Sequence, residues 1–214
     1  LPIQFFKSFE VRSDHERGIE KIFKSSGTTN SGRSQHSVTD LELYERSFLE
    51  GFKSFYGAVE DYVVLALLPN YIEQGDSSLV YMVDQFIEQS KHEESGYCLA
   101  NLEQTALLLN ELKQKGKKVL LIGVTYALLD LIEYQNFDLT NQFVIMETGG
   151  MKGRRKELTK QELHHLLKKG FGVTTVHSEY GMTELLSQAY SMGETKFRTP
   201  KWMKVFIRDI NDPL

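Results

Sequence analysis

Residues 118–134 read KVLLIGVTYALLDLIEY, and this stretch decides the fold. Residues 118–124 predict a strand, because after Lys118 they form a continuous run without polar side chains, which is typical of a strand covered on both faces. Residues 125–134 follow without a break and predict a short helix. A buried strand that leads directly into a helix begins a βαβ unit, so the stretch predicts a parallel sheet.

The same alternation extends along the chain in both directions. Further strands are predicted over residues 21–24, 62–68, 143–147, 173–177 and 204–209, and residues 3–11 are expected to be extended. Helices are predicted over residues 78–89, 102–115 and 159–169, and one more begins at Thr39. Thr39 with Glu42, and Thr159 with Glu162, have the spacing of capping boxes. We therefore expect a single α/β domain over residues 1–214, with a mostly parallel sheet flanked by helices.

The helix that begins at Thr39 has an aromatic face. Tyr44, Phe48, Phe52 and Phe55 recur at helical spacing, which indicates a core-facing stripe and not a cofactor site.

The composition excludes several classes of protein. A net charge of −4 and a pI near 5.9 give no overall attraction to nucleic acid or to an anionic membrane. The sequence has no apolar run of the roughly 18 residues that a membrane span requires, and no signal segment opens it. Cys98 is the only cysteine, which suits a reducing compartment. We predict a cytoplasmic protein without a nucleic-acid partner or a membrane span.

A loop rich in hydroxyl groups and glycine follows the strand at residues 21–24. It begins Ser25-Ser26-Gly27-Thr28-Thr29 and continues Asn30-Ser31-Gly32. Backbone amides and hydroxyls that cluster in one turn can form the concave set of donors that a phosphate requires. The alternative is a serine-rich surface loop without a ligand.

The same loop also has the spacing of a nucleotide-binding P-loop. Residues 27–34 read GTTNSGRS, in which Arg33 takes the place of the P-loop lysine. Arginine does not reproduce the compact charge of that lysine. A P-loop also enters a helix at once, whereas here residues 35–38 precede the predicted helix. A P-loop phosphotransferase is therefore the second hypothesis.

A second loop follows the strand predicted at residues 173–177. It runs from His177 to Glu184 and contains the motif Tyr180-Gly181-Met182-Thr183-Glu184. The aromatic ring can stack on a base, the hydroxyl can donate to a phosphoryl oxygen, and the carboxylate can bind a hard cation such as Mg²⁺. The alternative is a simple connection from a strand to a helix that Thr183 caps.

Together the two loops resemble the adenylate-forming superfamily of acyl-CoA synthetases, luciferases and adenylation domains. Residues 25–29 resemble its phosphate loop, and residues 180–184 resemble its Tyr-Gly-x-Thr-Glu motif, in the same order and about 150 residues apart. Residues 149–153 (GGMKG) and the short gap are most similar to the acyl-protein synthetase of bacterial luminescence. The resemblance implies the large N-terminal lobe of such an enzyme, truncated, with the C-terminal lobe and its catalytic lysine absent. Such a fragment is expected to be inactive or nearly so by itself.

The resemblance also implies roles for individual residues. Ser25, Ser26, Gly27, Thr28 and Thr29 would surround the β- and γ-phosphates of ATP. Gly149 and Gly150, with Tyr180 and Gly181, would contact the adenine. Thr183 and Glu184 would be catalytic, Thr183 at the α-phosphate and Glu184 as the Mg²⁺ ligand. His177 and Met182 are the candidates for the acyl pocket.

The activity that the resemblance implies is the ATP-dependent conversion of a carboxylic acid, expected to be a fatty acid, into an acyl adenylate. The acyl group would pass to a thiol or protein acceptor. The sequence departs from the family at residues 30–33, where Gly-x-Pro-Lys is usual, and it lacks the ribose-binding aspartate motif. These departures leave a third hypothesis open, a non-catalytic module that binds a nucleotide or acyl group. Cys98 lacks a neighbouring base and is interpreted as a structural thiol.

Overall fold

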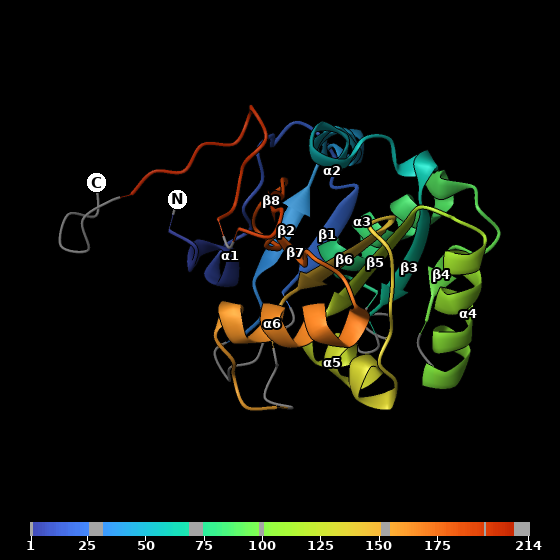
Figure 1. The fold of residues 1–214 in the computed structure, drawn as a ribbon. Helices are drawn as coiled ribbons and strands as arrows, with labels where there is room; N and C mark the ends of the chain where they lie inside the picture. The colour runs from blue at the N-terminus through green and yellow to red at the C-terminus, as the bar shows by residue number, and fades with distance from the viewer. Residues whose placement is uncertain are drawn as a thin grey trace.

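The chain folds around a six-stranded sheet with the strand order β4-β3-β5-β6-β7-β8 (Figure 1). The computed structural model describes residues 2–25, 32–68, 75–98, 101–150, 155–194 and 196–207. The strands are Val63–Leu67 (β3), Gly96–Tyr97 (β4), Val119–Val124 (β5), Phe143–Thr148 (β6), His177–Tyr180 (β7) and Ala189–Ser191 (β8). All neighbours pair in parallel except β7 and β8. This confirms the predicted α/β class and the mostly parallel sheet.

Helices cover both faces of this sheet. Figure 1 shows α2 (Leu41–Tyr56) on one side and α5 (Thr125–Tyr134) with α6 (Lys160–Phe171) on the other. Helix α3 (Ser78–Ser90) packs against α2 and β3, and α4 (Leu102–Gln114) packs against α5. Two short helices complete the set, α1 (Phe5–Ser8) and the 3-10 helix η1 (Val59–Asp61).

The aromatic stripe of α2 joins this helix to α3 and β8. Phe52 is fully buried, and its ring centre lies 5.0 Å from that of Phe86 on α3. On its other side the Phe52 ring lies 6.3 Å from Tyr190 on β8. Aromatic pairs at these separations add to the stabilisation that burial provides. The stripe is therefore core, as predicted, and it fixes β8 beside α2.

A small second sheet holds the loop that follows residue 24. Strand β1 (Lys21–Lys24) pairs antiparallel with β2 (Gln35–Val38), with Lys24 opposite Gln35. The strand at residues 21–24 was predicted, whereas β2 was not. The two strands make a hairpin, so the serine-rich loop connects antiparallel neighbours.

Two of the helix starts test the capping predictions. The capping box of Thr159 and Glu162 is present at α6 and is confirmed. At α2 the prediction was wrong by one residue, because Asp40 caps the helix and its side chain accepts a hydrogen bond from the Leu43 amide. Aspartate is as good a capping residue as threonine, and the carboxylate also favours the positive end of the helix.

Three sequence expectations about extended segments were wrong. Residues 3–11 contain helix α1. Of the strand predicted over residues 204–209, residues 204–207 lie outside any strand and residues 208–209 lie outside the described residues. The strand predicted over residues 173–177 begins only at His177, because β7 pairs with the carboxyl half of β6 through Met146, Glu147 and Thr148. Strand β7 continues to Tyr180, so Glu179 and the first residue of the Tyr-Gly motif both lie in the sheet.

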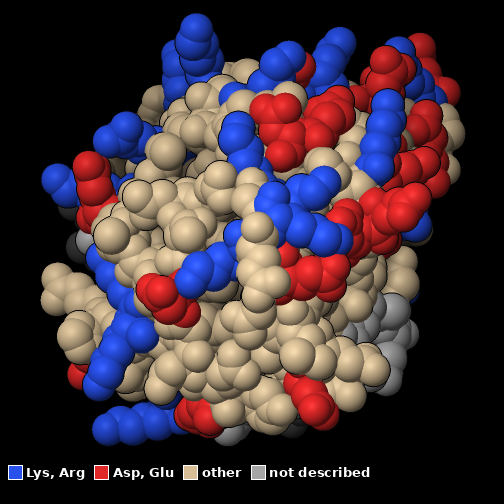
Figure 2. Space-filling view, turned by 45° about the vertical axis from the view of Figure 1, so that its right-hand side comes forward, with Lys and Arg blue, Asp and Glu red and all other residues tan. Residues whose placement is uncertain are grey.

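The distribution of charged side chains on the surface is consistent with the modest net charge of the sequence. Figure 2 shows basic and acidic side chains interspersed on the face that it presents. In the described part of the chain, no helix combines the length and the apolar character needed to cross a membrane.

Candidate functional site

A cavity of about 500 Å³ lies where β6 and β7 end. Ligands of parallel α/β sheets bind at the carboxyl ends of the strands, and about 300–1,000 Å³ is usual for a small-molecule site. Three segments singled out in the sequence line it together, namely Ser25, Gly149 and residues 180–184. Lys24, the amino end of α3 at Ser77 and Ser78, and Lys160 on α6 contribute further walls.

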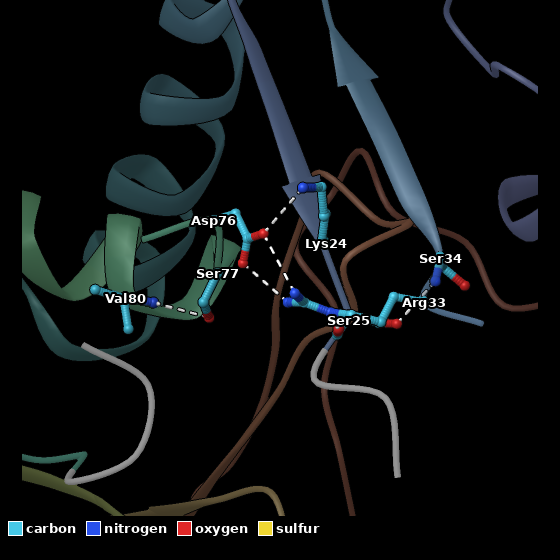
Figure 3. A network of polar contacts seen from close by, with 7 residues as sticks. All are labelled: Lys24, Ser25, Arg33, Ser34, Asp76, Ser77 and Val80. Atoms are coloured by element: carbon cyan, nitrogen blue, oxygen red, sulfur yellow. Dashed lines mark hydrogen bonds and ion pairs between the residues drawn. The ribbon is translucent and has the colours of Figure 1, made fainter. Parts of the chain in front are cut away.

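Ser25 lies at the closed neck of the β1–β2 hairpin (Figure 3). Its amide donates to the Ser34 carbonyl at 3.0 Å, and its hydroxyl accepts a hydrogen bond from the Ser34 amide at 2.9 Å. The other predicted phosphate-loop residues, Ser26, Gly27, Thr28 and Thr29, lie outside the described residues. The structure thus places the base of the loop at the cavity.

Arg33 joins this neck to the start of α3. Its Nε donates to the Ser25 carbonyl, and its Nη2 lies 2.9 Å from Asp76 Oδ1 (Figure 3). Lys24 Nζ lies 3.4 Å from the other oxygen of Asp76. Asp76 directly precedes Ser77, which caps α3. The Arg33 guanidinium therefore links the hairpin to the start of α3. A P-loop would lead directly into a helix, whereas this loop leads into strand β2, so the geometry differs from that of a P-loop.

Replacing Arg33 with lysine is expected to loosen the hairpin neck. Lysine keeps the charge but cannot donate to Ser25 and Asp76 through one planar fork. Because the pair is partly exposed, we expect a loss of about 1 kcal/mol, which would raise amide hydrogen exchange at Ser34 about fivefold. Hydrogen exchange followed by NMR measures this. Arg17→Lys, at an exposed ion pair with Asp40, is the matched control and should leave Ser34 unchanged. Equal exchange in both variants would show that the Arg33 link does not hold the neck.

The loop after β7 is tied to neighbouring elements through its backbone. The Thr183 carbonyl lies 2.9 Å from Nδ1 of His36 on β2, and the Leu186 carbonyl accepts a hydrogen bond from Ser47 on α2 at 2.8 Å. The loop turns back into β8, so Thr183 does not cap a helix. These bonds hold the loop where Thr183 and Glu184 line the cavity.

Tyr180 presents an aromatic face at the mouth of the cavity. Its side chain is 45% exposed, and its ring packs edge-on against Phe197 at 5.9 Å. Gly149, at the end of β6, also lines the cavity and has φ of 69°, a conformation that favours glycine. Gly150 follows it but does not line the cavity. The structure thus brings Gly149, Tyr180 and Gly181 to one wall.

Two buried carboxylates beside the cavity were missed in the sequence. Glu147 on β6 accepts a hydrogen bond from Lys160 and lies 3.5 Å from Nε2 of His164. Burial alone would raise the pKa of Glu147, but the hydrogen bonds from His164 and Lys160 outweigh burial and lower it. Glu179 on β7 lines the cavity itself and accepts a hydrogen bond from the Thr148 hydroxyl. Burial raises the pKa of Glu179 to about 7, the Thr148 hydrogen bond opposes that rise, and the charge of Glu147 adds to it.

The two acyl-pocket candidates lie in different places. Met182 lines the main cavity, whereas His177 lines a separate cavity of about 260 Å³. His177 Nδ1 lies 3.3 Å from the Tyr56 hydroxyl, and burial lowers the pKa of His177 to about 4, so the ring is neutral at pH 7. Cys98 lies outside both cavities, and burial raises the pKa of its thiol to about 11.

Two carboxylates, Glu179 and Glu184, line the main cavity. Among the described residues, no three His, Cys, Asp or Glu side chains form a group that could hold a metal by themselves. Mg²⁺ usually binds through one or two carboxylates together with phosphates and water. Glu184 is the carboxylate for which the sequence resemblance implies this role. Comparisons with protein-family models, with curated proteins and with solved structures find no match to this chain.

Proposed function

We propose that this chain forms the nucleotide-binding part of an enzyme that activates a carboxylic acid as an acyl adenylate. The observation that carries the proposal is the single cavity onto which Ser25, Gly149 and residues 180–184 converge. These segments lie up to about 150 residues apart in the sequence. Their convergence at the carboxyl ends of β6 and β7 supports a common ligand.

The nucleotide would lie across this wall. Tyr180 offers its exposed face to the adenine, and Gly149 lets the backbone approach the base. Thr183 would donate to the α-phosphate. Ser25 and the predicted loop Ser26–Thr29 would donate to the β- and γ-phosphates, next to the amino end of α3, whose positive dipole favours anions.

Glu184 would hold Mg²⁺, which neutralises charge on the phosphates. In the reaction, a carboxylate oxygen of the acid attacks the α-phosphorus. The bond from that phosphorus to the pyrophosphate oxygen breaks, which gives acyl adenylate and pyrophosphate. Donors that are already in place, such as Thr183, stabilise the charge that develops on the phosphate oxygens. The acyl group would then pass to a thiol or protein acceptor.

Exchange of labelled pyrophosphate into ATP, dependent on added carboxylic acid and catalysed by the full-length enzyme of which this chain would form part, tests the proposal. Glu184→Gln is expected to lower that exchange at least tenfold, because the amide is a poorer magnesium ligand than the carboxylate. Glu103→Gln, at an exposed carboxylate on α4, is the control and should leave exchange unchanged. A screen of fatty and aromatic acids that gives no exchange would sink the proposal, and full exchange in Glu184→Gln would remove Glu184 from it.

A further inference from the structure

The innermost wall of the main cavity is polar and buried. Glu179 and Gln188 line the cavity, yet their exposures are only 6% and 5%. Tyr44 on α2 lines it as well and is fully buried. Buried polar groups in proteins are almost always hydrogen-bonded, so each of these side chains can be checked for its partners.

The hydrogen bonds at this wall leave one amide oxygen unpaired. The Tyr44 hydroxyl donates its only proton to the Ser78 carbonyl at 3.2 Å. The Gln188 Nε2 group therefore donates to the Tyr44 oxygen, at 3.3 Å, and the amide orientation is fixed. Gln188 Oε1 is buried and has no hydrogen-bond partner among the described residues.

Glu179 adds a second acceptor that lacks a cation. Thr148 donates one hydrogen bond to its carboxylate, and no Lys, Arg or His in the described part of the chain forms an ion pair with it. The two lysines that line the cavity are engaged elsewhere, Lys24 with Asp76 and Lys160 with Glu147. Acceptors thus exceed donors at the inner wall, and a buried acceptor without a donor is costly.

We propose that the inner wall binds a primary ammonium group of the substrate, which donates to Glu179 and Gln188. The inference rests on the proposed function and specifies its substrate class: an amino-substituted carboxylic acid. An ammonium group offers three N–H donors and a positive charge, which supplies what both acceptors lack. The end of an unsubstituted fatty chain would leave Glu179 and Gln188 desolvated and unpaired.

Acids of equal length with and without an amino group test this assignment. The probes are hexanoate and its 2-amino, 4-amino and 6-amino derivatives, compared by kcat/KM in acid-dependent pyrophosphate exchange catalysed by the same full-length enzyme. We expect at least one amino derivative to exceed hexanoate by roughly tenfold to a hundredfold, the usual worth of a hydrogen bond to a charged group. Glu179→Gln removes the charge, so the ratio of kcat/KM between the amino derivative and hexanoate should fall to about threefold or less.

Two controls separate this inference from the proposed function. Glu50→Gln, at an exposed carboxylate on α2, should keep the preference of the unmodified protein. A cooperative urea unfolding transition of Glu179→Gln shows that the variant is folded, and the inference is read from the ratio of kcat/KM between amino derivative and hexanoate within each protein. Exchange that favours hexanoate over every amino derivative, or a preference that survives in Glu179→Gln, would overturn the inference and leave the ligase proposal standing. No exchange with any acid would overturn both.

Discussion

At pH 8, Glu179→Gln is expected to make the folded protein more stable by about 3 kcal/mol, which follows from a pKa near 7 in place of 4.5. The folded protein binds a proton at Glu179 that the unfolded chain has already released. Stability is therefore lost as the pH rises from about 4.5 through 7, and the loss is complete above that range. Glutamine carries no charge and can still accept the hydrogen bond from Thr148.

The groups around Glu179 explain why its charged form is unfavourable. Glu147 on β6 keeps a lowered pKa and so remains ionised beside it. Tyr44 on α2 and Tyr190 on β8 are buried, with pKa values raised by burial and by the charge of Glu179, so neither compensates it. These neighbours offer no positive charge, which leaves the hydrogen bond from Thr148 as the main opposing effect.

Urea unfolding at pH 5 and at pH 8 measures the expected change. The difference in unfolding free energy between the variant and the unmodified protein should be small at pH 5 and large at pH 8. Glu50→Gln, whose carboxylate is exposed, should show no such dependence. A Glu179→Gln protein that is less stable at pH 8 would mean that the carboxylate has a favourable partner, which would also count against the ammonium site.

The helices and strands that the sequence predicts well are those whose secondary structure is determined by their own residues. Residues 119–124 are apolar throughout, and they form a strand in which every residue is buried. The box of Thr159 and Glu162 satisfies the first turn of α6 from within four residues, so the signal is local. Long apolar runs and caps therefore identify the parallel sheet and most of its helices.

The strands that were not predicted depend on their partners. β2 (QHSV) is mostly polar and pairs only because β1 lies beside it. β8 (AYS) has three residues, and it is fixed by β7 and by the packing of Tyr190 against Phe52. Local composition carries no signal for such strands, since their stabilisation comes from contacts that are distant in sequence.

The residues of the candidate site also fall into those that the local sequence identifies and those that only the fold brings to the cavity. The loops at Ser25 and residues 180–184 were identified from their chemistry, and the cavity brings them together. Gln188 was missed because nothing nearby in the sequence shows that it faces Tyr44. Glu147 carried a usable signal, because a carboxylate in a predicted strand of a sheet covered on both faces must be buried and requires a partner. Glu179 carried none, because the strand predicted before it ended at residue 177.

Gly172→Ala is expected to cost about 2–4 kcal/mol of unfolding free energy, because two separate penalties act at this position. Gly172 ends α6 with φ of 67°, a left-handed conformation that residues with a Cβ rarely adopt. A Cβ there would also lie 2.6 Å from the Phe137 carbonyl oxygen and 2.7 Å from Asp138 Cα. Both are backbone atoms, so relief requires the chain at residues 137–138 to move.

That movement would disturb the end of α6 and hence the cavity wall. The Phe137 amide donates to the Gly170 carbonyl at 2.7 Å, and the Leu139 amide donates to the Phe171 carbonyl at 2.9 Å. These bonds hold α6, which carries Lys160 and His164 to Glu147. Gly18→Ala is the matched control, since its Cβ would meet nothing within 4 Å. Urea unfolding at pH 7 should show the loss for Gly172→Ala and almost none for Gly18→Ala. A loss below about 1 kcal/mol for Gly172→Ala would show that residues 137–138 yield easily, so that α6 is held by its side-chain packing and not by this backbone contact.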